Sequence, residues 1–301
     1  MRTFSARNAV TAIIYRALLI MAVVAGLSAG TIRAQGPPPS FSPDQLDNMV
    51  SRVALYPDPL LAQIFAAATY PDQIPDAAKY ADEHHYLTGD ALAQAIQADM
   101  LPWDPSVQAL IPFPSVLETM AGDMKWTSDL GNAFLAQQQD VEDAVQRMRQ
   151  KAKDFGYLRT NGQVVVSGGP YITINPVDPA LLYVPYYDPL VVYVAPRPGF
   201  FVGGAIRFGF SVRLGVGFAP WGWGATRFDW GAHRVFIADR PWGRTWVNRA
   251  TYVHPYAANF HRYAPSNRVE THTLTPRSTR EREAARTGHA RVEEHRRDDH
   301  R

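Results

Sequence analysis

The tripeptide Tyr-Pro-Asp occurs twice, at residues 56–58 and 70–72, and Trp103 and Asp104 repeat the aromatic and acidic types further along the chain. Carboxylates gathered beside aromatic side chains could carry out acid–base chemistry, because a pair of carboxylates can cleave a glycosidic bond. They could also bind a hard cation such as calcium. Asp58, Asp72 and Asp104 are therefore the candidate catalytic residues of a hydrolase that acts on cell-wall glycan or ester.

The same three aspartates also suit a structural role. Each one stands at the expected start of a helix, where a carboxylate can accept hydrogen bonds from free backbone N–H groups. Asp-Pro steps recur at 104–105, 178–179 and 188–189, and a proline in the first helical position costs no hydrogen bond. Helix capping explains these repeats without a reaction, and we expect it to be the role of the three aspartates.

Other common catalytic motifs are absent from the sequence. There is no Cys, which excludes thiol nucleophiles and disulfides, and there is no HExxH, GxSxG, SxxK, P-loop or Gly-rich dinucleotide motif. His84 and His85 are adjacent on an expected helix, so their side chains point about 100° apart and cannot chelate one ion together. The sequence therefore predicts no cofactor and no metal site, and it favours a protein that is not an enzyme.

The N-terminus is typical of an export signal. Residues 1–16 contain three Arg and no acidic residue, and residues 17–30 are uncharged and mostly apolar. That apolar run is shorter than the roughly 20 residues that a membrane helix needs, and Ala34 supplies a small residue before a cleavage point. We predict a signal peptide over 1–34 and an exported protein, either periplasmic or associated with the outer envelope. An uncleaved N-terminal anchor is the alternative.

Charge divides the mature chain into three parts. Residues 35–195 carry 8 Lys/Arg and 19 Asp/Glu, a net charge of −11, whereas residues 196–264 carry 9 Arg, no Lys and 2 Asp, a net charge of +7. Residues 265–301 are polar and mixed in charge, with 9 Arg and 7 acidic residues, and this composition predicts a disordered tail.

The basic segment combines arginines with aromatic residues, a composition typical of surfaces that bind anions or stack on rings. Its candidate binding residues are Arg207, Arg213, Arg227, Arg234, Trp221, Trp223 and Trp230. An exported protein rarely meets nucleic acid, so the expected ligands are anionic envelope polymers such as lipopolysaccharide or acidic glycans, or the membrane surface. Alternatively, these arginines are solvated or pair with the acidic segment.

Hydrophobic periodicity predicts an α+β protein. Residues 35–43 are Pro-rich and predict a linker, and residues 44–156 predict an all-helical domain of about six helices, the last running from near residue 127 to 154. A small antiparallel β appendage follows and completes a domain over 44–195. Its expected strands lie at 163–166, 171–174, 181–184 and 190–194.

Residues 206–218 alternate between apolar residues and Arg, Gly or Ser. This period of two predicts a strand with one wholly apolar face. With the Trp/Gly turn that follows, it predicts a Gly-, aromatic- and Arg-rich module over 196–264, either β-rich or of low complexity. The apolar face would pack on strands of the module or contact a bilayer, which one strand cannot span alone.

Four segments resemble one bacterial envelope family, Domain of Unknown Function 3300. They read ALYPDPLLAQIFAAATYP, WDPSVQALIPFPSVLETM, WTSDLGNAFLAQQQDVEDAVQRMRQKA and YVPYYDPLVVY. The resemblance extends over residues 45–195 in the order of the family. It implies an exported domain, and it brings no reaction, ligand or catalytic residue.

Together these features predict an exported cell-envelope protein that acts as a binding or structural module without catalysis. It would contact anionic envelope polymer, a membrane surface, another envelope protein or a second copy of itself. Two alternatives remain open: the hydrolase that uses Asp58, Asp72 or Asp104, and a periplasmic chaperone or assembly factor that uses the aromatic strand.

Overall fold

The computed structural model describes residues 36–199 and 203–256. The predicted signal peptide over 1–34 and the predicted tail over 265–301 lie outside the described residues. Within the described ranges the chain forms nine α-helices, two 3₁₀ helices and seven strands. The predicted α+β class is confirmed.

Helices dominate the first part of the described chain. They are α2 (Pro43–Val50), α3 (Asp58–Ala68), the 3₁₀ helix η1 (Pro71–Gln73), α4 (Ile74–Glu83), α5 (Gly89–Ala98), α6 (Pro105–Gln108), α7 (Pro114–Gly122), α8 (Met124–Ala136) and α9 (Gln138–Asp154). The predicted number of about six is too low, partly because one expected helix is divided at Gln137. There the backbone leaves the helical region (φ −140°, ψ 47°), and the Gln137 side chain bonds both the N–H and the C=O of Phe41.

Acidic and hydroxyl side chains begin several helices, as the sequence predicts for an N-cap. Ser42 and Gln45 form a reciprocal capping box at α2, and Asp123 accepts the Trp126 N–H at the start of α8. Asp188 likewise caps α10 (Pro189–Val192) by accepting the N–H of Leu190 at 2.8 Å. The predicted strand at 190–194 is therefore wrong, because the Asp-Pro step starts a short helix.

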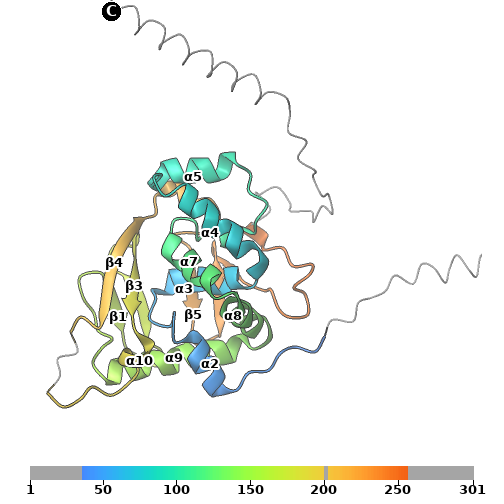
Figure 1. The fold of residues 1–301 in the computed structure, drawn as a ribbon. Coiled ribbons are helices and arrows are strands. Elements are labelled where there is room, and N and C mark those ends of the chain that lie inside the picture. Colours follow the sequence, from blue (N-terminus) through green and yellow to red (C-terminus); the bar gives the residue numbers. More distant parts are fainter. Residues whose placement is uncertain (1–35, 200–202, 257–301) are drawn as a thin grey trace, which may run out of the picture. The chain divides into compact units, whose positions relative to one another are not determined.

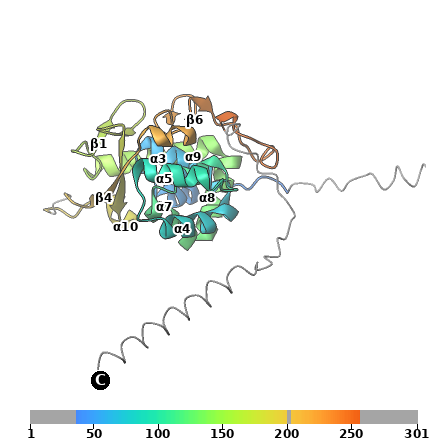
Figure 2. The ribbon, with the colours of Figure 1, turned by 90° about the horizontal axis from the view of Figure 1, so that it is seen from above.

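Three small antiparallel sheets complete the fold. They contain β1 (Val164–Ser167) with β2 (Thr173–Pro176), β3 (Leu181–Tyr187) with β4 (Ile206–Arg213), and β5 (Arg227–Asp229) with β6 (Arg234–Ile237) and β7 (Arg240–Pro241). Figure 1 shows β1, β3 and β4 on one side of the helices, and the view from above in Figure 2 shows β6 along another side.

The strand predicted over 206–218 is shorter than expected. It ends at Arg213, and the chain then forms the 3₁₀ helix η2 (Val216–Trp221). The register with β3 shifts between Tyr183 and Pro185, and Phe210 opposite this irregularity is 63% exposed. The apolar face is therefore interrupted, since a bulge changes which side chains point inward.

Helix α3 forms the centre of the hydrophobic core. All of its residues except Pro59 are buried, so it packs on every side, as a helix without a polar face must. Helix α8 approaches its C-terminal end so closely that a Cβ added at Gly131 would lie 1.9 Å from the carbonyl oxygen of Ala68. Only glycine fits at that contact.

Residues after the predicted boundary at 195 also contribute to this core. Phe218, Trp221, Val235 and Ile237 are buried in the same hydrophobic cluster as the helices. A smaller cluster joins Leu55 and the end of α9 to β1 and β2. No helix within residues 36–199 and 203–256 is long and apolar enough to cross a membrane.

The substitution Gly131→Ala tests the contact between α3 and α8. We expect it to lower the free energy of unfolding by about 2–3 kcal/mol, because overpacking forces the two helices apart. Gly122→Ala is the control, since an added Cβ there meets nothing within 4 Å. Urea denaturation measures both variants, and equal stabilities would contradict the close packing.

Candidate functional site

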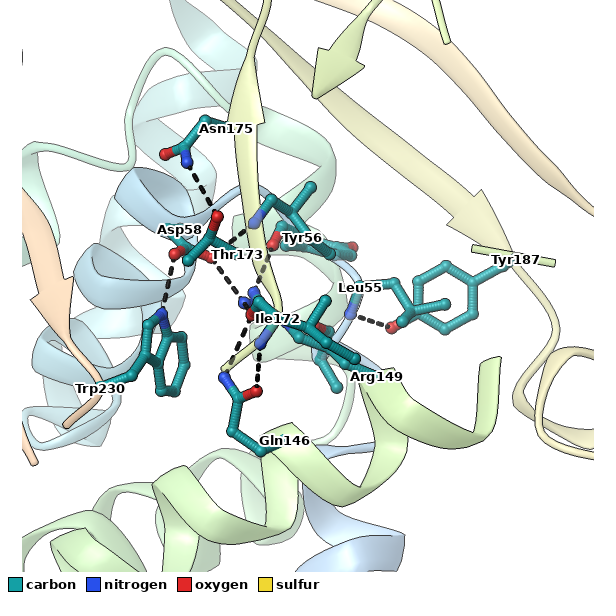
Figure 3. Close-up of polar contacts among 12 residues, drawn as sticks. Leu55, Tyr56, Asp58, Gln146, Arg149, Ile172, Thr173, Asn175, Tyr187 and Trp230 are labelled. Atoms are coloured by element: carbon teal, nitrogen blue, oxygen red, sulfur yellow. Dashed lines mark hydrogen bonds and ion pairs between the residues drawn. The ribbon is translucent and has the colours of Figure 1, made fainter. Parts of the chain in front are cut away.

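Asp58 lies at the first residue of α3, and its carboxylate is bound from three directions (Figure 3). Its Oδ1 lies 2.7 Å from Nη1 of Arg149 and accepts the N–H of Ile174 at 3.3 Å, while Oδ2 accepts the indole N–H of Trp230 at 2.9 Å. The predicted capping role is wrong for this residue, because Pro57 is the N-cap and α3 has no side-chain cap. Its charge is instead matched by a buried ion pair.

The Arg149 guanidinium is fully buried and hydrogen-bonded along its whole edge. Besides the carboxylate, it donates to the carbonyl oxygens of Ala54 (2.8 Å), Ile172 (2.9 Å) and Tyr56 (3.1 Å). Its centre also lies 4.9 Å from the ring centroid of Trp230. A buried ion pair is tolerated when its remaining donors and acceptors are satisfied in this way. Asp58 and Arg149 therefore hold separate segments together and leave no free group for a reaction.

The second Tyr-Pro-Asp repeat is held by another arginine from far along the chain. Arg244 donates from Nη1 to the carbonyl oxygen and to the hydroxyl of Thr69, the C-cap residue of α3. Its guanidinium also lies 3.6 Å from the ring centroid of Tyr70. A cation at a helix C-terminus is favourable because carbonyl groups point toward it. Each copy of the repeat is thus bound by one arginine, at opposite ends of α3.

Asp104 and Asp72 have different surroundings. Asp104 caps α6, accepting the N–H of Ser106 at 2.9 Å and its hydroxyl at 2.6 Å, so the predicted cap is confirmed. Burial raises the pKa of Asp104. Asp72 is exposed on η1 and caps no helix, since Gln73 precedes α4 without a side-chain cap. Both acids lie near Arg244, away from Asp58, so the three do not form one site.

A buried acid that sequence reasoning missed is Glu142 on α9. Its Oε1 accepts a hydrogen bond from Gln138 at 3.0 Å, whereas Oε2 has no hydrogen-bond partner and lies 3.7 Å from Nδ1 of His233. Burial, with Asp143 and Asp229 nearby, raises the pKa of Glu142 from 4.5 to about 7. Glu142 and Arg149 share a helical face with Val145, and this spacing could have indicated that both are buried.

The histidine pair lies where α4 ends. His84 is the C-cap residue of that helix and stacks on Tyr80, and His85 is exposed. Among the described residues no group of three or more His, Cys, Asp or Glu side chains is placed to hold a metal ion.

The three tryptophans predicted to bind a ligand lie in the core. Trp221 is 0% exposed, and Trp223 and Trp230 are each 5% exposed. The indole N–H of Trp221 donates to Oε1 of Gln108 at 2.9 Å, and that of Trp223 donates to the carbonyl oxygen of Ala109 at 3.1 Å. In this fold their rings are unavailable for stacking on a large ligand, and they anchor the C-terminal segment to the helices.

The predicted arginines are exposed, but they lie on two different sheets. Arg207 and Arg213 are on β4, and Arg227 and Arg234 are on β5 and β6. Arg227 pairs with Asp239, and Arg213 lies 4.0 Å from Asp178, whereas neither of the other two forms an ion pair with another described residue. Arg240 on β7, in the same basic segment, is also exposed.

The exposed residues of the β3–β4 pair combine two of these arginines with tyrosines. Tyr186 pairs with Arg207, Tyr183 with Ser211, and Leu181 with Arg213, while Leu182 and Val212 point into the core. The Tyr186 ring lies over Gly209, where an added Cβ would be 2.8 Å from the ring. We call the exposed and partly exposed residues Tyr183, Tyr186, Arg207, Ser211 and Arg213 of this strand pair the ribbon surface.

Comparison with known proteins places these features in a family context. A family model described as "Protein of unknown function (DUF3300)" matches residues 42–238, beyond the 45–195 expected from the resemblance. "Uncharacterized protein YacH" of Escherichia coli (strain K12) is 36% identical over 187 residues, which cover 51% of this chain and 30% of that relative. The chain thus spans less than a third of that relative's length. No solved structure matches the chain.

The buried pair can be compared with an exposed pair on the same helix. Arg149→Met leaves the Asp58 carboxylate buried without its partner, and we expect a loss of about 3–5 kcal/mol of unfolding free energy. Arg147→Met removes the partly exposed pair with Asp47, and we expect a loss of under about 1 kcal/mol. Urea denaturation measures the unfolding free energy of both variants. Similar losses in the two variants would contradict the central role of the buried pair.

The raised pKa of Glu142 predicts a pH-dependent stability. The folded protein keeps this proton up to about pH 7, while the unfolded chain loses it near 4.5. Folding is therefore favoured at low pH, and this contribution is lost as the pH rises from 4.5 through 7. Glu142→Gln should flatten that part of the stability profile and stabilise the protein at pH 8.

Thermal unfolding across this pH range measures the effect. His233→Asn is the control for the neighbouring imidazole, because asparagine tolerates the positive φ of 48° at this position. An unchanged profile in Glu142→Gln would assign the pH dependence to other groups.

Proposed function

The chain belongs to the DUF3300 family of proteins of unknown function, and we propose that it is an exported, non-enzymatic binding protein of the bacterial cell envelope. Its ligand would be an anionic envelope polymer that carries phosphate or carboxylate groups. The exposed arginines on the two sheets are the observation that carries this proposal.

Export is supported by the sequence. The basic start, the short apolar run and the small residue at Ala34 have the layout of a secretory signal. The lack of Cys is compatible with an oxidising compartment, because no thiol can form an unwanted disulfide there.

A binding role is favoured over catalysis by the state of the carboxylates. Asp58 is 4% exposed and holds Arg149, and Asp104 caps a helix. Asp72 is exposed on η1, and its carboxylate forms no hydrogen bond or ion pair with another described residue that could act as its catalytic partner. Glu142 has the raised pKa expected of a general acid, but its side chain is fully buried away from solvent.

The ribbon surface has the chemistry to bind an anionic polymer. Arg207 and Arg213 are both exposed, near the two ends of β4, so they offer two separate contact points to the repeated anionic groups of a chain. Guanidinium groups bind phosphate and carboxylate through two parallel hydrogen bonds. The exposed Tyr186 beside Arg207 adds an aromatic surface with a hydroxyl group.

Arg234 and Arg240 provide a second cationic surface on the β5–β7 sheet. Two separate cationic surfaces on one molecule would bind a polymer more tightly than either alone, because the second contact is intramolecular. The high positive charge of residues 196–264 would also speed the encounter with an anionic polymer.

Point substitutions on the ribbon surface test this proposal. Deleting the basic segment would expose the core, so we choose Arg207→Gln/Arg213→Gln, with Lys79→Gln/Lys125→Gln as a control of equal charge change on exposed helical residues. The wild type and the control should stay with the envelope fraction at low salt and be released by about 0.5 M NaCl, because salt screens exposed charges.

The arginine variant should appear in the soluble fraction at low salt. Retention of this variant, or a requirement for detergent to release the wild type, would contradict binding of an anionic polymer by the ribbon surface.

A further inference from the structure

A second candidate site lies between two segments that are distant in sequence. A shallow cavity of about 490 Å³ opens between the connection that joins β1 to β2 and the β5–β6 hairpin. Its walls include Gly168, Gly169 and Tyr171 on one side and Phe228, Asp229 and Phe236 on the other. It shares no residue with the ribbon surface, and neither Arg234 nor Arg240 lines it, so its role goes beyond the function proposed above.

Aromatic rings form the floor of this cavity. Phe228 stacks on Trp230 with ring centroids 4.1 Å apart and planes 11° from parallel. Trp230 in turn is fixed by its hydrogen bond to Asp58 and by Arg149 over its ring. Tyr171 on the opposite wall is partly exposed. The buried ion pair at the start of α3 therefore also makes this floor rigid.

Hydrogen-bonding groups of both kinds surround the floor. Asp229 is exposed and supplies a carboxylate acceptor. The N–H groups of Gly168 and Gly169 donate no hydrogen bond to another described residue. Arg227 supplies further N–H donors at the cavity. Its guanidinium lies 4.4 Å from the ring centroid of Phe236 and pairs with Asp239.

The charges at this rim nearly cancel. The two charged residues that line it, Arg227 and Asp229, have opposite charges, and Arg227 also pairs with Asp239. A rim of this kind offers little net attraction to a strongly anionic ligand, and its polar groups would be costly to cover with an apolar one.

We propose that this cavity binds a saccharide unit of an uncharged glycan. One face of a sugar ring presents C–H groups, which pack against aromatic rings, while its hydroxyls both donate and accept hydrogen bonds. Tyr171 and Phe228 provide the aromatic contact, Asp229 accepts, and Gly168 and Gly169 donate. Small-ligand sites combine a mostly apolar floor with a few placed polar groups in this way.

Two substitutions in the cavity test the proposal. Tyr171→Ala removes an aromatic wall, and Asp229→Asn removes the charge of the acceptor while keeping its shape. The matched controls are Tyr86→Ala and Asp72→Asn, because both residues are exposed and neither lines the cavity. Thermal unfolding of each variant establishes that it is folded before binding is measured.

The probes are maltotetraose and the tetramer of N-acetylglucosamine, titrated into the full chain by calorimetry and by NMR. We expect at least one probe to bind, with an affinity that about 0.5 M NaCl does not change, because the ligand is uncharged. Each cavity variant should bind at least about tenfold more weakly, through loss of an aromatic contact in Tyr171→Ala and of a hydrogen bond to a charged group in Asp229→Asn, while both controls bind as the wild type does.

Absence of binding by both probes would overturn the proposal, and so would equal affinities of the cavity variants and the wild type. The ribbon-surface variant Arg207→Gln/Arg213→Gln should bind the saccharide normally. A loss of saccharide binding in that variant would place the site on the ribbon surface and would also overturn the assignment to this cavity.

Discussion

Helix α3 is buried along nearly its whole length, and a charged group must be satisfied at each of its ends. Asp58 at the start binds Arg149 of α9, and Thr69 at the end binds Arg244 of the C-terminal segment. Removing a charge from water is costly unless its partner and its remaining hydrogen bonds are in place. The rest of the described fold must therefore bring α9 and the segment after β7 to opposite ends of one helix.

This requirement explains why the Arg- and Trp-rich segment belongs to the core. Gln63 in the middle of α3 donates to the carbonyl oxygen of Trp221 at 3.0 Å, and Trp221 donates to Gln108 at 2.9 Å. These buried amide groups of Gln63 and Gln108 thus depend on a residue that comes much later in the chain. The family match to residue 238 covers this segment through β6, as one shared core would require.

The same packing separates residues that stabilise the protein from residues that remain available to a ligand. Asp58, Arg149 and the three tryptophans are used inside, which leaves exposed arginines on β4 to β7 and a shallow aromatic cavity beside β5. The rigid floor of that cavity rests on Trp230, whose indole N–H binds Asp58. Trp230, which the sequence suggests as a ligand-binding residue, therefore contributes to the cavity indirectly, by packing against Phe228.

Local physics in the sequence determined the α+β class, the family, the amphipathic helices and the caps at Asp104 and Asp188, because these depend on neighbours along the chain. Only the tertiary structure decided the features that depend on contacts between residues far apart in the sequence. It placed Asp58 in an ion pair instead of a cap, divided the helix at Gln137, and ended the alternating strand at Arg213. The Tyr-Pro-Asp repeats mark both ends of α3, but their partners are distant arginines, and only folding brings a buried charge to its counter-charge.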